Sequence, residues 1–277
     1  MRSIELIVLL LGDQGDPVSR AILEKRHRFG RDVIAIPFDD LVADVTIGPR
    51  WQWRGITIDP AHAAVVNRLP SAQPPADETT SFFRQQQIWT LLYAELQRFA
   101  YASSIPSVTS LIGCHGSLLD QWIDLPKRVP DLPVPAFRAP WDERGLHGDV
   151  YAVDPWRLYS LGEPISPRTQ RQRGRIEYVR PKGALMHVAQ VGGTILFVNA
   201  PQLSPTQHGS IVAFTREMAR ASSARILEHA FFVDRELPVF YSTYPVPIVT
   251  GQHPAYGDLL IDGLNDDIER RCAILAA

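Results

Sequence analysis

Apolar residues in the first third of the chain switch between strand-like runs and helix-like spacing. Residues 4–11 form a nearly continuous apolar run, which is typical of a strand buried on both faces of a parallel sheet. Residues 17–29 follow with apolar positions three and four apart, and residues 32–36 again alternate like a strand. Two further strands are predicted at 51–58 and 63–66. We therefore expect an α/β arrangement in this third.

The strongest helix signal in the sequence spans residues 78–102. This stretch lacks glycine and proline, and apolar residues recur in it every three or four positions. We interpret it as a packing helix whose apolar stripe, including Leu92 and Leu96, faces a core, rather than as a catalytic helix. Several prolines follow between Pro126 and Pro140, where they argue against a helix interior and indicate a hinge between sub-domains.

The second half of the chain is predicted to be mixed α+β with antiparallel strand pairs. Two of its strands, 186–191 and 194–199, are separated by Gly192-Gly193, a strong two-residue hairpin signal. The other predicted elements are a strand at 176–179, a helix at about 205–222, a strand pair at 231–233 and 238–241, and a closing helix near 259–274.

Composition and charge narrow the class of protein. With 277 residues, of which 45% are hydrophobic, the chain can bury a sizeable core, and we expect two or three sub-domains. Lys and Arg number 28 against 30 for Asp and Glu, and without a polybasic block nucleic-acid binding is disfavoured. Cys114 and Cys272 are too few and too far apart for a disulfide framework, so a cytoplasmic location is expected. The run at 4–11 is too short to cross a bilayer, and no membrane association is expected.

Three other local patterns give little support for a catalytic, metal or dinucleotide-binding site. We interpret Cys114-His115 as a loop with a structural cysteine rather than as a catalytic thiol beside its base, since adjacent loop residues seldom face each other. The eight histidines show no metal-ligand spacing. Residues 12–15 form a turn that could face a ligand at the carboxyl end of a parallel sheet, but they do not match the glycine motif of dinucleotide-binding proteins.

Several stretches, taken in order, carry a resemblance to a known family. They are 64–70, the helix at 83–101, the Leu-Pro-Val-Pro turn at 132–135, the strand and hairpin at 176–198, and the strand pair that ends near Pro247. Their order resembles the ATP-grasp superfamily, in the branch of carboxylate–amine ligases that modify ribosomal proteins or cross-link graspetide precursors. The resemblance implies an N-terminal α/β domain at 1–110, a linker with a reduced small grasp sub-domain at 111–170, and a mixed, largely antiparallel grasp domain at 171–277.

The same resemblance implies a site for two Mg²⁺ ions, and there this sequence departs from the family. Ala230, Ser242 and Tyr244 stand where the family has an aspartate, a glutamate and an asparagine. Neither serine nor tyrosine is a good Mg²⁺ ligand, because this ion prefers carboxylate and carbonyl oxygens. A shift of register would bring Glu228 or Asp234 nearby. We therefore expect a degenerate metal site that holds no divalent ion.

The part of the resemblance that concerns the nucleotide also shows departures. Leu185 and His187 replace the aspartate and arginine that the family carries on its hairpin. Residues 128–181 contain no lysine, although the family places a phosphate-contacting lysine in its small sub-domain. Asn199 would become a metal ligand if 195–201 were the metal-binding strand, but the elements that follow favour the hairpin reading.

Positive charge is concentrated in one segment, at Arg168, Arg171, Arg173, Arg175, Arg180 and Lys182. The cluster is either a solvated loop or an anion contact, because the guanidinium fork suits phosphate or carboxylate. By the resemblance it leads into the strand that lines the nucleotide cleft. The candidates for the nucleotide side or for anion binding are Arg173, Arg175, Glu177, Tyr178, Val179 and His187.

Two functions from different classes follow. The first is an ATP-grasp-like protein with a degenerate Mg–ATP site and no cofactor, which recognises a peptide or protein partner, acidic or not, or assists an active ligase. The second is an active ligase in which ATP and Mg²⁺ phosphorylate a carboxylate for attack by an amine. Its relocated metal ligands would come from Asp149, Asp154, Glu177, Glu228, Asp234 and Glu236. A doubly wound metabolic protein without ATP is a third alternative, and the sequence leaves open whether the chain forms a homodimer.

Overall fold

The computed structural model describes residues 7–12, 14–46, 48, 50–59, 63–68, 104–105, 117–129, 133–139, 141–142, 145–155, 160–165, 174–221, 226–244 and 248–276. They fall into two compact units, one from Met1–Thr109 with Gly257–Ala277 and the other from Ser110–Tyr256. The helix predicted at 78–102, with Leu92 and Leu96, lies outside the described residues, as does Cys114-His115. Within the described ranges, no helix is long and apolar enough to cross a membrane.

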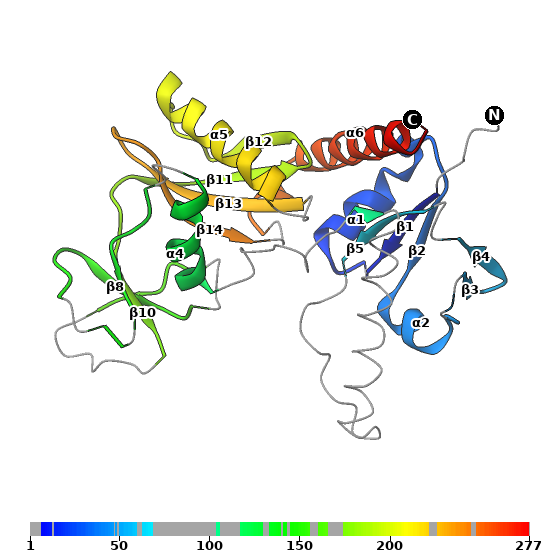
Figure 1. The fold of residues 1–277 in the computed structure, drawn as a ribbon, viewed down its shortest axis with the longest axis horizontal. Coiled ribbons are helices and arrows are strands. Elements are labelled where there is room, and N and C mark those ends of the chain that lie inside the picture. The colour runs from blue at the N-terminus through cyan, green and yellow to red at the C-terminus, as the bar shows by residue number, and fades with distance from the viewer. Residues whose placement is uncertain are drawn as a thin grey trace. The chain divides into compact units, whose positions relative to one another are not determined.

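A parallel sheet in the order β2-β1-β5-β6 organises the first unit (Figure 1). Its strands are β1 (Ile7–Leu11), β2 (Val33–Ile36), β5 (Ala63–Asn67) and β6 (Ser104–Ile105). The helical segments near these strands are α1 (Pro17–Glu24), the 3₁₀ helix η1 (Arg26–Phe29) and α2 (Phe38–Ala43). Strand β1 has neighbours on both sides, and its residues from Val8 to Leu11 are fully buried, as its continuous apolar run predicts. The α/β prediction for this region is confirmed.

The turn after β1 is held by an ion pair at the start of α1. Asp16 caps the helix by accepting a hydrogen bond from the Ser19 N–H at 2.7 Å. The same carboxylate pairs with the buried guanidinium of Arg68, at 3.0 Å from Nε and 2.7 Å from Nη2. A Cβ added to Gly12 would meet Arg68 and Ser19 side-chain atoms at 2.8 Å, so the chain passes too closely there for any larger residue.

Residues 51–58, predicted as one strand, form a hairpin instead. Strand β3 (Trp51–Trp53) pairs antiparallel with β4 (Ile56–Ile58). Arg54 and Gly55 have φ values of 47° and 78°, so both turn residues are left-handed, as in a type I′ turn. The prediction was wrong because Gly55 allows the chain to reverse within a run whose composition is otherwise strand-like.

The closing helix α6 (Tyr256–Ala276) belongs to the first unit from Gly257 onward, whereas the sequence prediction places 171–277 in one C-terminal domain. Ion pairs join it to the segment around η1: Lys25–Asp258 at 2.5 Å and Arg28–Asp262 at 2.7 Å. Such exposed pairs contribute little each. The helix also buries an apolar face made of Leu260, Ile261, Leu264 and Ile268. Burial of this face is the stronger physical reason for the helix to dock.

Two antiparallel four-stranded sheets form the second unit, in the orders β7-β10-β8-β9 and β12-β11-β13-β14. The first contains β7 (Phe137–Arg138), β8 (Val150–Val153), β9 (Glu163–Pro164) and β10 (Ile176–Val179). The second contains β11 (Ala184–Val191), β12 (Thr194–Val198), β13 (Ile226–Val233) and β14 (Val239–Tyr244), with helix α5 (Pro205–Ala221) beside it (Figure 1). The small sheet therefore takes in β10, which the prediction assigned to the domain that follows residue 170.

The hairpin prediction in this unit is confirmed. Strands β11 and β12 pair from His187 opposite Val198 to Val191 opposite Thr194. Gly192, with φ of 57°, begins the two-residue turn between them. The last two strands are longer than the predicted 231–233 and 238–241, because polar residues interrupt their apolar pattern although they too are buried.

Helix α4 (Leu118–Arg128) overturns the expectation that Pro126 lies outside a helix. The helix begins with a capping box, in which Ser117 and Asp120 exchange backbone and side-chain hydrogen bonds. Pro126 falls in its last turn, where few further helical bonds are lost. The buried residues on its inner face are Leu118, Trp122 and Leu125. Capping and burial together outweigh the proline.

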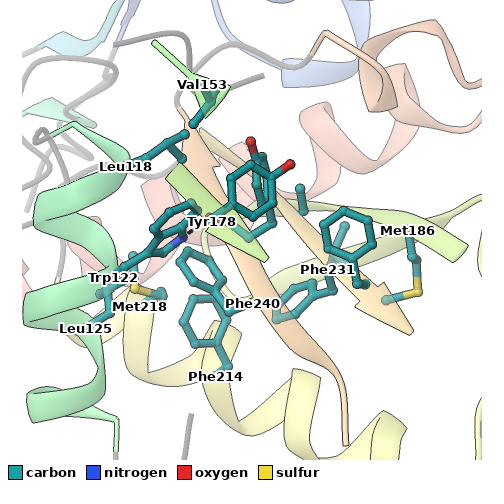
Figure 2. Packing of buried hydrophobic residues seen from close by; sticks show 14 of the residues in the cluster. Leu118, Trp122, Leu125, Val153, Tyr178, Met186, Phe214, Met218, Phe231 and Phe240 are labelled. Atoms are coloured by element: carbon teal, nitrogen blue, oxygen red, sulfur yellow. Dashed lines mark hydrogen bonds between the residues drawn. The ribbon is translucent and has the colours of Figure 1, made fainter. Parts of the chain in front are cut away.

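An aromatic core joins α4 to both sheets of the second unit. Figure 2 shows Trp122 of α4 beside Tyr178 of β10, with Phe214 and Phe240 packed beneath them. The Trp122 ring centroid lies 5.4 Å from that of Tyr178, and its indole N–H donates to the Tyr241 carbonyl at 2.7 Å. The two sheets therefore share one core.

Candidate functional site

Strand β13 directs alternate side chains to opposite faces of its sheet. Phe231 and His229 meet the ring of Phe214 on α5, at 5.4 and 5.3 Å between centroids, so they face that helix. Glu228, Ala230 and Phe232 must therefore face the other way. We call this side the Glu228 face, and it consists of His187, Glu228, Ala230, Phe232, Ser242 and Tyr244. In its register, Ala230 lies opposite both His187 and Ser242, and Glu228 lies opposite Tyr244.

Glu228 is fully buried and lies at the centre of a hydrogen-bond cluster. Its carboxylate accepts bonds from the Thr250 N–H at 2.9 Å, the Thr250 hydroxyl at 2.6 Å and the Val249 N–H at 3.1 Å. The Tyr244 hydroxyl also donates to it, and His187 Nδ1 lies 3.0 Å from Oε1. The carboxylate thus fixes the segment around the 3₁₀ helix η3 (Thr250–Gln252) to the sheet.

The same contacts determine the charge states in the cluster. Burial raises the pKa of Glu228, but hydrogen bonds from His187, Thr250 and Tyr244 outweigh burial and leave this pKa below its usual range. Burial and the neighbouring carboxylate raise the pKa of Tyr244, so its hydroxyl stays protonated and donates. Glu228 is therefore ionised at neutral pH, and its oxygens are occupied by donors of the protein itself.

The three positions predicted to form a degenerate metal site lie on this face, and their side chains are poor metal ligands. Ala230 has no ligand atom, and Tyr244 is bonded to Glu228. The Ser242 hydroxyl is fully buried and has no hydrogen-bond partner within the described ranges. In the part of the chain that the structure describes, no three His, Cys, Asp or Glu side chains group as a metal site would require.

A second buried polar cluster lies on the opposite face. His229 Nε2 lies 2.7 Å from Gln190 Oε1, and its Nδ1 lies 2.6 Å from the Thr243 hydroxyl. Burial lowers the pKa of His229 to about 3, so the ring is neutral and these bonds assign its proton to Nε2. The Gln121 side chain of α4 donates to the Thr243 carbonyl at 2.9 Å and accepts from its N–H at 2.8 Å. A side-chain amide thereby continues the sheet beyond the edge strand β14.

Sequence reasoning missed the Gln121–Thr243 pairing and the role of His229. Nothing in the sequence relates Gln121 to a strand more than a hundred positions away. The adjacent pair Glu228-His229 within the apolar run 226–233 was the available signal, because two polar residues in a strand buried on both faces need partners.

The predicted nucleotide-side residues do not converge. Arg173 lies outside the described residues, and Arg175 pairs with exposed Glu163 at 3.5 Å. Glu177 is ion-paired with Arg138 across the small sheet, where Val179 lies opposite Val150. Tyr178 belongs to the core: its hydroxyl donates to the Leu161 carbonyl at 2.7 Å, and burial raises its pKa to about 12. Of the candidates that the structure describes, His187 alone lies on the Glu228 face.

The relocated metal ligands considered above are also dispersed. Asp149, Asp234 and Glu236 are exposed, and Asp154, which directly follows β8, is half-buried. Asn199, the alternative ligand, is exposed and follows β12, whose antiparallel pairing with β11 supports the hairpin. Glu228 is therefore the one carboxylate of that set on the Glu228 face.

Arg180, just after β10, does reach this face. Its guanidinium lies 5.3 Å from the Tyr151 ring centroid and 5.8 Å from that of Phe232. It donates a hydrogen bond to the Tyr151 hydroxyl at 3.2 Å. A cation from the small sheet thus stands over the apolar part of the Glu228 face.

No family model and no curated protein sequence matches this chain. Solved structures do match it. The macrocyclase MdnC from Microcystis aeruginosa, bound with precursor peptide MdnA, has a TM-score of 0.72 at 10% identity, over 96% of this chain and 100% of that chain. The ATP-grasp ligase PsnB, complexed with precursor peptide PsnA2 and AMPPNP, has a TM-score of 0.72 at 14% identity, over 97% and 99%.

A third solved structure is similar to this chain. The Chryseobacterium gregarium RiPP-associated ATP-grasp ligase, in complex with ADP and a leader and core peptide, has a TM-score of 0.60 at 10% identity, over 96% of this chain and 97% of that chain. At such low identity the likeness concerns the fold. This chain has the ATP-grasp fold, which confirms the fold that the resemblance implied.

Proposed function

We propose that this protein uses the ATP-grasp fold to recognise a peptide, without Mg²⁺-dependent phosphoryl transfer of its own. The observation that carries the proposal is the Glu228 cluster. A carboxylate that could have served as a metal ligand is instead saturated by Thr250, Val249 and Tyr244.

The residues of this face do not fit Mg²⁺. The ion requires near-octahedral oxygen ligands at about 2.0–2.1 Å. Ala230 supplies no oxygen, Ser242 a neutral hydroxyl, and Glu228 would have to release several donors. Each buried donor left without a partner costs about 1–3 kcal/mol. No step of the proposed function therefore passes through a metal–nucleotide complex.

A peptide partner is supported by the structures that share the fold. MdnC is bound with precursor peptide MdnA, PsnB with PsnA2, and the Chryseobacterium gregarium ligase with a leader and core peptide. The proposal is that this chain retains peptide recognition, as a cytoplasmic protein that needs no cofactor, and acts alone or as an accessory to an active ligase. The positive segment from Arg168 to Lys182 favours an acidic partner.

An active ligase is the second candidate, because Glu228 is ionised and lies two positions from Ala230 on the same face of the sheet. In that case a carboxylate substrate would be phosphorylated and then attacked by an amine. Calorimetry separates the two candidates. We expect ATP to bind no more tightly with Mg²⁺ than without it, in wild type and in Glu228→Gln alike. Magnesium-dependent ATP binding that Glu228→Gln abolishes would refute the proposal and support the ligase.

A further inference from the structure

We propose that strand β12 pairs with β12 of a second copy of this chain, so that two copies of the sheet β12-β11-β13-β14 join edge to edge. The inference goes beyond the proposed function and does not depend on it. It rests on a contrast between the two edges of this sheet, and on the charge and side-chain pattern around the open one.

The edge formed by β14 is closed by the protein itself. The Gln121 side chain pairs with both backbone groups of Thr243, at 2.9 and 2.8 Å. Further along the strand, the Phe240 N–H donates to the Pro133 carbonyl at 2.8 Å. Folded proteins cover sheet edges in this way because unpaired backbone groups invite pairing with another chain. The β14 edge therefore has little to offer a partner.

The opposite edge, formed by β12, is open. The hairpin turns in two residues, so Val191 and Thr194 form a hydrogen-bonded pair, and the pairs alternate from there along the strand. The N–H and C=O groups of Ile195 and Phe197 therefore point away from β11. No hydrogen bond joins these groups to any residue that the structure describes. The edge offers both donors and acceptors to an incoming strand.

The surroundings of this edge carry no charge. Residues 183–215, which contain β11, β12 and most of α5, include no Asp, Glu, Lys or Arg, although 21% of the chain is charged. Helix α5 borders the edge, since the His208 ring stacks on that of Phe197 at 5.0 Å between centroids. Charged side chains commonly protect sheet edges, and like charges directly opposite each other destabilise a strand pair. An uncharged edge favours an uncharged partner, and a second copy of β12 is one.

The strand is also complementary to itself. A two-fold axis at Leu196 sets Ile195 opposite the partner's Phe197, and each such pair exchanges both of its backbone hydrogen bonds. Phe197 and His229 both lie opposite Val188, so these aromatic–aliphatic pairs form on the face that α5 covers. On the other face, Leu196 meets its own copy. Such cross-strand pairs stabilise a sheet.

Sedimentation velocity of the full chain tests the association. A strand pair flanked by one helix is a small interface, so we expect a weak dimer with a dissociation constant of about 10–100 µM. Leu196→Lys places two positive charges opposite each other at the axis and should raise this constant at least about tenfold. Leu196→Val, which stays apolar, should change it less than about threefold.

Ala213→Lys is the matched control for the added charge. Ala213 is exposed on α5 and lies about 140° around the helix from His208, so this lysine should also change the constant less than about threefold. If Leu196→Lys does not fold, Ile195→Pro decides the question. It removes an outward N–H, which edge strands tolerate, and should likewise weaken the dimer.

Amide hydrogen exchange measured by NMR locates the interface. Raising the protein concentration should slow exchange of the Ile195 and Phe197 amides, whereas the Leu196 amide, which faces Ala189 within the hairpin, should not change. Protein that stays monomeric up to about 500 µM would overturn the proposal and leave the edge to an extended peptide. A dimer that Leu196→Lys and Ala213→Lys weaken equally, or that leaves the Ile195 and Phe197 amides unprotected, would also overturn it.

Discussion

Glu228→Gln tests whether the Glu228 face is held together by its own hydrogen bonds. The carboxylate is fully buried and accepts bonds from Thr250, Val249 and Tyr244. Glutamine has nearly the same volume but offers one oxygen and an amide NH₂, so at least one donor at 249–250 loses its acceptor. Breaking a buried charged cluster from one side costs about 3–5 kcal/mol. We expect the free energy of unfolding to fall by about 3 kcal/mol or more.

Urea unfolding at several pH values measures this loss and its cause. The pKa of Glu228 lies below its usual value of 4.5, so the folded state favours the ionised carboxylate. Its contribution is complete above about pH 4.5 and disappears as the pH falls through the lower pKa of the folded state. The variant should lack this part of the acid destabilisation. Exposed Glu236→Gln is the control. A loss below about 0.5 kcal/mol, as at surface positions, or an unchanged acid slope below pH 4.5 would refute the reasoning.

Three further predictions concern packing and charge. Gln121→Ala should cost about 1–3 kcal/mol for each Thr243 backbone group left unpaired, and urea unfolding with normal m-value would show it. His229 has a pKa near 3 in the fold and 6.5 when exposed, so wild type should lose stability as the pH falls between these values; His229→Gln should flatten that slope between pH 6.5 and 4.5. Leu92→Ala or Leu96→Ala should cost about 2–5 kcal/mol if 78–102 is a packing helix, and a loss below about 0.5 kcal/mol would mark that stripe as exposed.

The sequence predicted the elements whose burial follows a simple period. The run at 4–11 is a central parallel strand, and Gly192-Gly193 turns a hairpin, because continuous apolar runs and glycine pairs each favour one local structure. The errors arose where tertiary packing overrides a local rule. Pro126 stays in α4 because capping at Ser117 and burial of Trp122 stabilise the helix.

The site was less predictable than the fold, for a geometric reason. The positions of Ala230, Ser242 and Tyr244 could be taken from a resemblance, but the register that sets Glu228 opposite Tyr244 depends on a bulge between Ala230 and Phe231. A bulge of this kind leaves no mark in the sequence. Without it, the role of Glu228 as acceptor for the segment at 249–250 could not be inferred.

Strand β13 carries two buried polar residues whose hydrogen bonds are all made within the protein. Glu228 and His229 are adjacent and buried, and Glu228 is ionised whereas His229 is neutral. Each side chain forms its hydrogen bonds with other groups of the protein. Replacing one of these internal hydrogen bonds by a bond to a ligand would gain little net free energy, because the bond that is lost is about as favourable as the bond that is formed. Ser242 differs, since its buried hydroxyl has no hydrogen-bond partner among the residues that the structure describes. A divalent ion would gain little on the Glu228 face, because the Glu228 oxygens already accept bonds from Thr250, Val249 and Tyr244, and Ser242 offers only a neutral hydroxyl.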